Sequence, residues 1–425
     1  MDQIVIEGGI PLKGSVSVAG AKNAALPILA ATLLCEGECR ILGVPNLRDI
    51  RTMLRLLTEL GCEVEREADG ALRIAVRDEA PFEAPYDIVK EMRASFSVLG
   101  PLLARRGRAS ASIPGGCNLG LRPIDLHLKG FRAMGAKIDF DQGYVRAEGP
   151  LHGEEIFLAG PFGPTVLGTA NVMCAAVLTD GRTVIEGAAC EPEVSDLANF
   201  LIACGARIEG VGSPRLVIDG VERLTGVEWR VIPDRMEAGT IMAAAAATGG
   251  DVTFEGAEPR HMSAVTEALR DLGAGVEKLG GEGGDRGIRV FGPTRPRPLD
   301  LTTLPFPGFP TDLQAPFAAV LVQAQGMSVV TEKIYPDRFM HVAELMRMGA
   351  SIRKQGPSTI IQGVDRLSGT EVMASDIRGG ASLIVAALAA SGTTNVHRVY
   401  HVDRGYDRIE EKLASLGARI RRVAE

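Results

Sequence analysis

One short pattern recurs six times along the chain and constrains its fold more than any other feature. Each copy places a glycine between an apolar residue or Cys and a small residue, directly after an amphipathic stretch, and the glycines are 68 to 76 residues apart. Glycine at this position stops a helix, because the left-handed backbone that follows the last turn costs it nothing. The copies are Leu60-Gly61-Cys62, Met134-Gly135-Ala136, Cys204-Gly205-Ala206, Leu272-Gly273-Ala274, Met348-Gly349-Ala350 and Leu416-Gly417-Ala418.

Each repeat of about 70 residues contains further elements in a constant order. An Ala-rich stretch, apolar nearly all round, predicts a buried helix; a short β-like run follows it, and then comes the amphipathic helix that ends at the glycine. In the first repeat, Asn46 and Asp49 resemble a cap for that second helix. The Ala-rich stretches are Ala24–Leu34, Ala94–Ala104, Thr169–Leu178, Ala238–Thr248, Gln314–Ala324 and Gly380–Ser391.

These repeats predict an α/β fold of two lobes with three repeats each. The sixth repeat ends near Glu425 before its last strand, and the N-terminal run Gln3–Ile6 is a candidate for that strand. We therefore expect a first lobe at residues 22–231 and a second lobe made of residues 1–21 plus 232–425. A cleft between two lobes is a common place for a ligand.

The amino-acid composition excludes several classes of function. The chain has 46 Lys and Arg against 53 Asp and Glu, a net charge of −7, which argues against a general nucleic-acid binder. Its longest apolar stretches are about half of the ~20 residues that span a bilayer, and we see no signal-peptide pattern at the N-terminus. Seven dispersed cysteines are typical of a reducing cytosol. We expect a cytoplasmic protein without a nucleic-acid, membrane or obligate protein partner.

The common nucleotide-binding, nucleophile and zinc motifs are absent from the sequence. There is no G-x-x-x-x-G-K-[ST], no G-x-S-x-G and no H-E-x-x-H. Cys35 and Cys39 are the only close pair of cysteines and lack a matching second pair, so we expect no metal site.

Charged and polar residues stand where the Ala-rich helices begin. Because helix N-termini carry unpaired N–H groups and partial positive charge, basic residues there indicate a phosphate or carboxylate ligand. Ordinary helix-end charge and salt bridges between lobes are the alternative. The residues are Lys22, Asn23, Arg93, Asp234, Arg235, Glu237, Asp312 and Arg378.

Two loops complete the candidate chemistry. Cys117 follows Pro114-Gly115-Gly116 and precedes Arg122, so it is either a reactive thiol or an inert buried one. The segment Phe306–Asp312 presents a carboxylate at a helix start, either as a general base or as an N-cap.

At these residues the sequence resembles the UDP-N-acetylglucosamine 1-carboxyvinyltransferase family over its whole length. The family fold is a two-lobed inside-out α/β barrel of six repeats. The resemblance is carried by Gly20-Ala-Lys-Asn-Ala-Ala-Leu-Pro27, the Cys117 loop, Pro307–Gln314, Tyr335–Val342 and Tyr400–Arg408.

The resemblance implies transfer of enolpyruvyl from phosphoenolpyruvate to the 3-hydroxyl of the sugar, with release of phosphate, as the first committed step of peptidoglycan precursor synthesis. It implies no cofactor, and sensitivity to the epoxide antibiotic fosfomycin. Cys117 would be the acid and Asp312 the base. Phosphoenolpyruvate would be held by Lys22, Arg122 and Arg404, with Arg378 assisting at the anionic centre. The nucleotide sugar would be held by Asn23, Arg93, Arg122, Pro123, Ile124, Asp125, Leu126, Asp312 and Ile334.

The sequence departs from the family pattern in one place. After Pro161 the family usually has a basic residue, which is missing here, and we expect Thr165 and Val166 to substitute in the nucleotide contact. Two alternative functions fit the sequence less well. A 3-phosphoshikimate 1-carboxyvinyltransferase would want a Lys-Ser pair where Lys22-Asn23 stands, and an idle UDP-sugar-binding protein would be expected to lose Cys117, Asp312 or Arg404.

Overall fold

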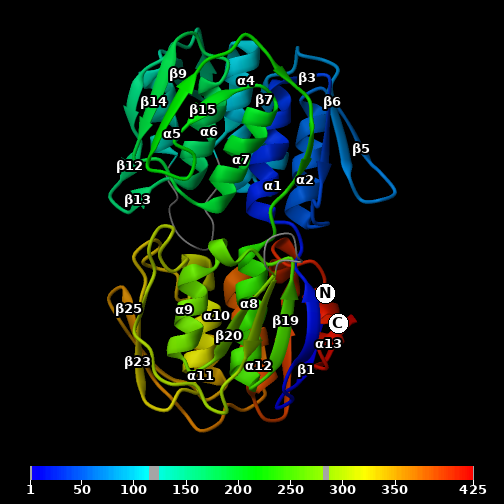
Figure 1. The fold of residues 1–425 in the computed structure, drawn as a ribbon, viewed down its shortest axis with the longest axis vertical. Coiled ribbons are helices and arrows are strands. Elements are labelled where there is room, and N and C mark those ends of the chain that lie inside the picture. The colour runs from blue at the N-terminus through cyan, green and yellow to red at the C-terminus, as the bar shows by residue number, and fades with distance from the viewer. Residues whose placement is uncertain (1, 114–123, 281–286, 425) are drawn as a thin grey trace. The chain divides into compact units, whose positions relative to one another are not determined.

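The computed structural model describes residues 2–113, 124–280 and 287–424, which divide into two compact units (Figure 1). Over these described positions, one unit consists of residues 20–232. The other consists of residues 2–19 together with 233–424. Each unit has its own hydrophobic core.

The Ala-rich stretches form the buried helices of the two cores. In α8, for example, every residue from Arg235 to Ala246 is buried. The helices α1, α6 and α7 of one core pack against each other, as do α8, α10 and α12 of the other. The buried helices are α1 (Lys22–Ala31), α4 (Leu99–Arg106), α6 (Val166–Ala176), α8 (Arg235–Thr248), α10 (Gln314–Leu321) and α12 (Ile377–Ala389).

The described residues form six four-stranded sheets that share one order of strands. The strand after each buried helix lies between a parallel edge strand and an antiparallel closing strand, and the closing strand also pairs with the strand after the repeated glycine. The strands after the buried helices are β4 (Glu38–Leu42), β8 (Arg108–Ser112), β14 (Arg182–Glu186), β19 (Asp251–Glu255), β23 (Met327–Thr331) and β27 (Thr393–His397). The parallel edge strands are β18 (Glu228–Arg230), β7 (Glu83–Ala84), β11 (Glu155–Phe157), β2 (Lys13–Ser17), β22 (Leu301–Thr302) and β26 (Glu371–Met373).

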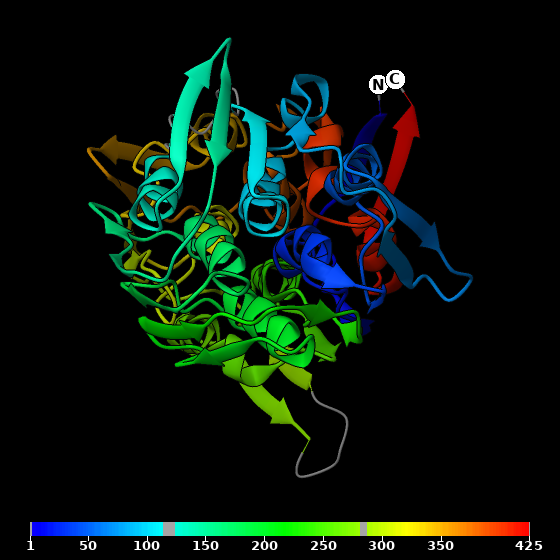
Figure 2. The same cartoon turned by 90° about the horizontal axis from the view of Figure 1, so that it is seen from above.

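The N-terminal strand completes the sixth sheet, as the sequence predicts. In five sheets the closing strand follows along the chain, but in the sixth it is β1 (Asp2–Glu7). Ile4 pairs with Val396 on one side and with Arg422 on the other. The two ends of the chain therefore lie side by side, as Figure 2 shows. The other closing strands are β6 (Leu72–Val76), β10 (Tyr144–Glu148), β16 (Arg215–Asp219), β21 (Gly287–Phe291) and β25 (Ser358–Gln362).

The repeated glycines end the second helix of each repeat, again as predicted. All six have positive φ, from 86° at Gly61 to 112° at Gly205. The helices that they end are α2 (Arg48–Glu59), α5 (Asp125–Ala133), α7 (Pro192–Ala203), α9 (Ser263–Asp271), α11 (His341–Arg347) and α13 (Ile409–Ser415). The strands that follow the glycines are β5 (Cys62–Arg66), β9 (Lys137–Asp141), β15 (Arg207–Glu209), β20 (Gly275–Leu279), β24 (Ser351–Gln355) and β28 (Arg419–Ala424).

Short elements connect this framework. Two-residue strands pair as β3 (Cys35–Glu36) with β17 (Leu224–Thr225) and as β12 (Ala159–Gly160) with β13 (Gly163–Pro164). The short helices are α3 (Tyr86–Val89), η1 (Thr32–Leu34), η2 (Arg93–Val98), η3 (Pro259–His261), η4 (Thr311–Leu313) and η5 (Val399–Arg404).

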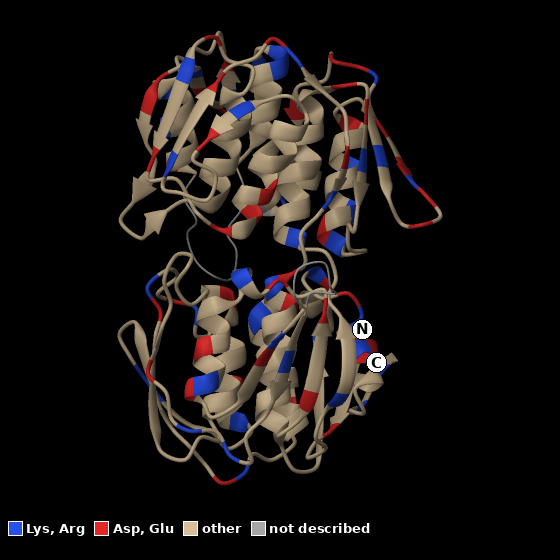
Figure 3. Ribbon diagram, in the orientation of Figure 1, with Lys and Arg blue, Asp and Glu red and all other residues tan. Residues whose placement is uncertain are grey.

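Charged residues of both signs are interspersed along the strands and loops of each unit (Figure 3). The buried helices carry few of them, and α6 and α10 carry none. Among the described helices, none is both long and apolar enough to span a membrane.

Candidate active site

The N-terminal ends of α8, α10 and α12 come together within the unit that contains residues 233–424. The three helices pack on one another, and Gly239 of α8 lies close to η4, because a Cβ added there would be 2.3 Å from the Leu313 side chain, just before α10. Asp376 caps α12 by accepting from the backbone N–H of Arg378 at 2.9 Å. Charged side chains at these helix starts are thereby brought within reach of one another.

Asp312 lies between two arginines at this end of the unit. Its Oδ1 accepts from Arg338 Nη2 at 2.6 Å, and its Oδ2 lies 3.5 Å from Arg378 Nη2. The Asp312 side chain is 25% exposed, whereas both arginine side chains are nearly fully buried. No side-chain capping bond forms at η4, which begins after Pro310, so the N-cap alternative for Asp312 is wrong. The structure instead gives a partly exposed carboxylate held by buried cations.

Arg378 is a buried cation with unused hydrogen-bonding capacity. Its guanidinium lies 5.2 Å from the centre of the Tyr406 ring, within the range of a cation–π contact. Among the described residues, its Nη1 atom has no hydrogen-bond partner although it is buried. An unsatisfied buried donor is costly, and an anion would satisfy it.

Arg404 and Ile334 lie in the same unit as Asp312. Arg404 is half-buried at the end of η5, and its positive charge contributes, after burial, to lowering the pKa of His401. Ile334 is half-buried in the turn after β23, where its backbone N–H donates to Glu332 at 2.7 Å.

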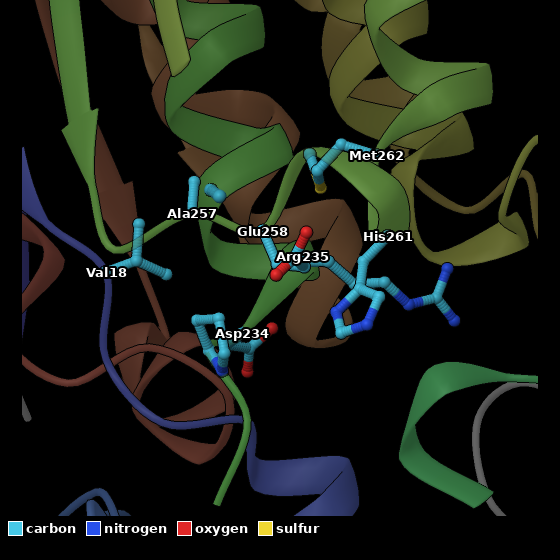
Figure 4. A pocket seen from close by; sticks show the side chains of 9 residues that line it. Val18, Asp234, Arg235, Ala257, Glu258, His261 and Met262 are labelled. Carbon is cyan, nitrogen blue, oxygen red and sulfur yellow. The ribbon is translucent and has the colours of Figure 1, made fainter. Parts of the chain in front are cut away.

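The start of α8 borders a shallow hollow that is too narrow to hold a water molecule (Figure 4). The side chains of Asp234, Glu258 and His261 line it, and Arg235 also contacts the Phe306 ring at 5.5 Å. Asp234 caps α8 by accepting from Met236 N at 2.8 Å. The third charged residue predicted there, Glu237, is buried and paired with Lys412 at 2.7 Å. The alternative of ordinary helix-end charge therefore accounts for the capping contact of Asp234, whereas the ion pair of Glu237 lies within one unit and is no salt bridge between lobes.

In the unit of residues 20–232, Lys22 begins α1 and is 6% exposed. Its Nζ lies 3.2 Å from Asp49 Oδ2, and both side chains are buried. The prediction that Asn46 and Asp49 cap the second helix is wrong, because Leu47 occupies the N-cap position without a side-chain bond. Asp49 instead neutralises the buried ammonium of Lys22.

The other predicted residues of this unit lie at helix starts. Thr165 caps α6 by accepting from Gly168 N at 3.2 Å, next to the half-exposed Val166. Leu126 of α5 packs close to Gly160 of β12, where an added Cβ would lie 3.3 Å from it. Of the remaining predicted residues, Asn23 lies in the first turn of α1, Arg93 begins η2, Ile124 immediately precedes α5 and Asp125 begins α5. Cys117, Arg122 and Pro123 lie outside the described residues.

Sequence reasoning missed three partners of the predicted residues: Asp49 for Lys22, Arg338 for Asp312, and Tyr406 for Arg378. Each lies 26 to 28 residues from its partner in sequence. Two of these partners, Arg338 and Tyr406, lie in the stretches Tyr335–Val342 and Tyr400–Arg408, which carry the family resemblance. That resemblance was the sequence signal that could have identified them. Within the described part of the chain, no group of three or more His, Cys, Asp or Glu could hold a metal ion.

Comparison with known proteins identifies the class of this fold. The family profile described as EPSP synthase (3-phosphoshikimate 1-carboxyvinyltransferase) matches residues 6–413. The structure resembles the enolpyruvyl transferase NikO from Streptomyces tendae, with a TM-score of 0.88 at 24% identity over 99% of both chains. It also resembles an EPSP synthase from Acinetobacter baumannii, with a TM-score of 0.73 at 21% identity over both full chains. The fold is therefore that of the enolpyruvyl transferases, as predicted.

Comparison with related sequences identifies the family within this class. UDP-N-acetylglucosamine 1-carboxyvinyltransferases from Anaeromyxobacter sp. strain Fw109-5 and Anaeromyxobacter dehalogenans strain 2CP-1 are 53% and 54% identical to the chain, over 99% and 100% of both proteins. The enzyme of that name from Methylacidiphilum infernorum is 51% identical, over 100% of this chain and 99% of its own. The chain belongs to the family of UDP-N-acetylglucosamine 1-carboxyvinyltransferases.

Proposed function

We propose that the chain transfers the enolpyruvyl group of phosphoenolpyruvate to the 3-hydroxyl of UDP-N-acetylglucosamine and releases phosphate. The observation that carries this proposal is the identity of 51% to 54% with enzymes of that name over essentially the whole chain. The reaction is the first committed step of peptidoglycan precursor synthesis.

The reaction proceeds by addition and then elimination through a tetrahedral ketal. It needs a base at the sugar hydroxyl, an acid at the methylene carbon and cations around the phosphate and carboxylate. We assign the base to Asp312, because its carboxylate is partly exposed and is held in place by Arg338 at 2.6 Å. We assign the acid to Cys117.

Four cations are proposed for the anionic groups. Lys22, Arg122 and Arg404 would hold phosphoenolpyruvate. Arg378 would stabilise the charge that develops at the reacting centre, since its buried Nη1 has no partner among the described residues. A donor already fixed and desolvated stabilises such charge without reorganising during the reaction.

The contacts proposed for the nucleotide sugar are those that the family resemblance implies. From residues 20–232 the proposed contacts are Asn23, Arg93, Arg122, Pro123, Ile124, Asp125, Leu126, Thr165 and Val166. From the other unit they are Asp312 and Ile334. We propose that the two units are the two lobes expected from the repeats. We also propose that the chain works in the cytoplasm, where free thiols persist.

Phosphate release tests the proposal directly. The purified chain is incubated with phosphoenolpyruvate and either UDP-N-acetylglucosamine or shikimate 3-phosphate, and the product is identified by mass spectrometry. We expect phosphate and an enolpyruvyl product only with the nucleotide sugar. The family profile bears the name of the shikimate enzyme. Turnover of shikimate 3-phosphate alone would therefore replace the proposal with that second function.

A further inference from the structure

Glu332 is a fully buried carboxylate that the catalytic assignment does not use. It directly follows β23 and has no exposed surface. Its Oε1 accepts hydrogen bonds from Thr303 Oγ1 at 2.7 Å, Ile334 N at 2.7 Å and Tyr335 N at 2.9 Å. Its Oε2 accepts from Thr311 Oγ1 at 2.9 Å. Four donors therefore surround one carboxylate.

The direction of these hydrogen bonds is fixed by the groups behind the two threonines. Arg338 Nη1 lies 3.0 Å from Thr311 Oγ1, and a guanidinium can only donate. The single hydroxyl proton of Thr311 is thus directed to Glu332. The backbone N–H of Lys333 likewise donates to Thr303 Oγ1 at 3.0 Å, which directs that hydroxyl proton to Glu332 as well. Glu332 consequently accepts all four bonds, as an ionised carboxylate can and an amide cannot.

The network leads to two residues of the proposed active site. Through Thr311, Glu332 fixes one side of the Arg338 guanidinium, whose other nitrogen donates to Asp312 Oδ1 at 2.6 Å. Through its Oε1, Glu332 holds the backbone turn that contains Ile334.

We propose that Glu332 is a positioning residue for enolpyruvyl transfer. It holds the base Asp312 in position through Thr311 and Arg338. It also holds the segment at Ile334, which is proposed to contact the sugar, through hydrogen bonds to the backbone. The inference rests on the proposed function, because that function gives Asp312 and Ile334 their roles. Glu332 itself has no exposed surface, so it acts only through these neighbours.

Two matched variants separate the two arms of the network. One arm runs from Glu332 through Thr311 and Arg338 to Asp312, and the other runs from Glu332 to the backbone turn at Ile334. Thr311→Val and Thr303→Val each replace one hydroxyl by a methyl of similar size. Thr311→Val removes both the bond to Glu332 and the bond from Arg338, so we expect it to lower kcat about tenfold, with little change in KM for UDP-N-acetylglucosamine. Thr303→Val should raise that KM about five- to tenfold with little change in kcat. Glu332→Gln can keep the three bonds at the Oε1 position through its amide oxygen and should resemble Thr311→Val, whereas Glu332→Ala should show both effects. Glu344→Gln is the control, because that carboxylate also accepts a backbone N–H, from Met373 at 3.0 Å, but contacts neither arm.

Hydrogen exchange tests the network independently of activity. In a folded Glu332→Ala protein, which has no acceptor at this position, the amides of Ile334 and Tyr335 should exchange about tenfold faster, whereas amides within β23 should be unchanged. Equal exchange in wild type and variant would overturn the proposed network. A similar fall of kcat in both threonine variants, with KM for UDP-N-acetylglucosamine unchanged in both, would also overturn the network, because loss of active protein has the same effect. A wild-type chain without transfer activity would overturn the proposed function, and with it the kinetic role of Glu332. The hydrogen-exchange measurement would still test whether the hydrogen-bond network exists.

Discussion

Asp196 gives a quantitative test of the packing around the chain's single tryptophan. Asp196 lies on α7 and is 3% exposed. Its Oδ1 accepts from Trp229 Nε1 at 3.1 Å and its Oδ2 from Ile232 N at 3.2 Å. Burial raises its pKa from 3.8 to about 6 against the lowering effect of these bonds, and the nearby Glu193 adds to the rise.

The magnitude follows from this difference in pKa. Between the unfolded and folded pKa values, the folded chain binds one proton more than the unfolded chain, so stability falls as pH rises through this window. At about 1.36 kcal/mol per pH unit, the free energy of unfolding should lose about 1.5 kcal/mol between about pH 4.5 and pH 6, and about 0.4 kcal/mol more by about pH 7.5, where the folded-state group has finished titrating.

The assay is urea unfolding followed by Trp229 fluorescence, which reports on this unit. The free energy of unfolding of wild type minus that of Asp196→Asn should fall by about 2 kcal/mol from about pH 4.5 to pH 7.5. Asp219→Asn is the control, because the exposed Asp219 pairs with Arg182 and has a lowered pKa. Its contribution is lost as pH falls, which is the opposite sign. A difference between wild type and Asp196→Asn that is independent of pH would refute the reasoning.

Three further predictions follow from single residues. Fosfomycin should alkylate Cys117 alone, as read by peptide mapping, because burial raises the pKa of thiols such as Cys62, to about 11, and keeps them protonated; an adduct elsewhere would contradict this. Gly349→Ala should lower the free energy of unfolding by about 1 kcal/mol in urea titrations, because φ is 97° there, although a Cβ would meet nothing within 4 Å; an unchanged midpoint would show that backbone strain is absent. Arg378→Lys should lower kcat about tenfold or more in steady-state assays, because an ammonium cannot keep both the Asp312 and ring contacts; wild-type turnover would remove Arg378 from the proposed centre.

The repeats made most of the fold predictable from sequence. A helix that ends at glycine and a buried Ala-rich helix are local patterns, and six copies reinforce one another. Even the pairing of β1 with β27 and β28 was predictable, because the sixth repeat lacked a strand and the N-terminus offered one.

The partners of the candidate residues were not predictable in the same way. Asp49 resembled a cap because it stood near a helix start, yet it pairs with Lys22 from another helix. Local spacing cannot distinguish these roles, because the choice depends on which buried charge the fold brings near. The same holds for Glu332, because two of its four donors are the hydroxyls of Thr303 and Thr311, which lie 29 and 21 residues away in the sequence.

The turnover of Asp312→Asn with phosphoenolpyruvate and UDP-N-acetylglucosamine tests the central claim most directly. The amide keeps the shape of the side chain and an oxygen that can accept from Arg338, so the fold and sugar binding should persist. An amide cannot take the hydroxyl proton, and general base catalysis contributes roughly 10²- to 10⁴-fold. The account predicts a folded variant that binds the nucleotide sugar and loses kcat by that factor. A folded variant with wild-type kcat would contradict the assignment of Asp312 as the base.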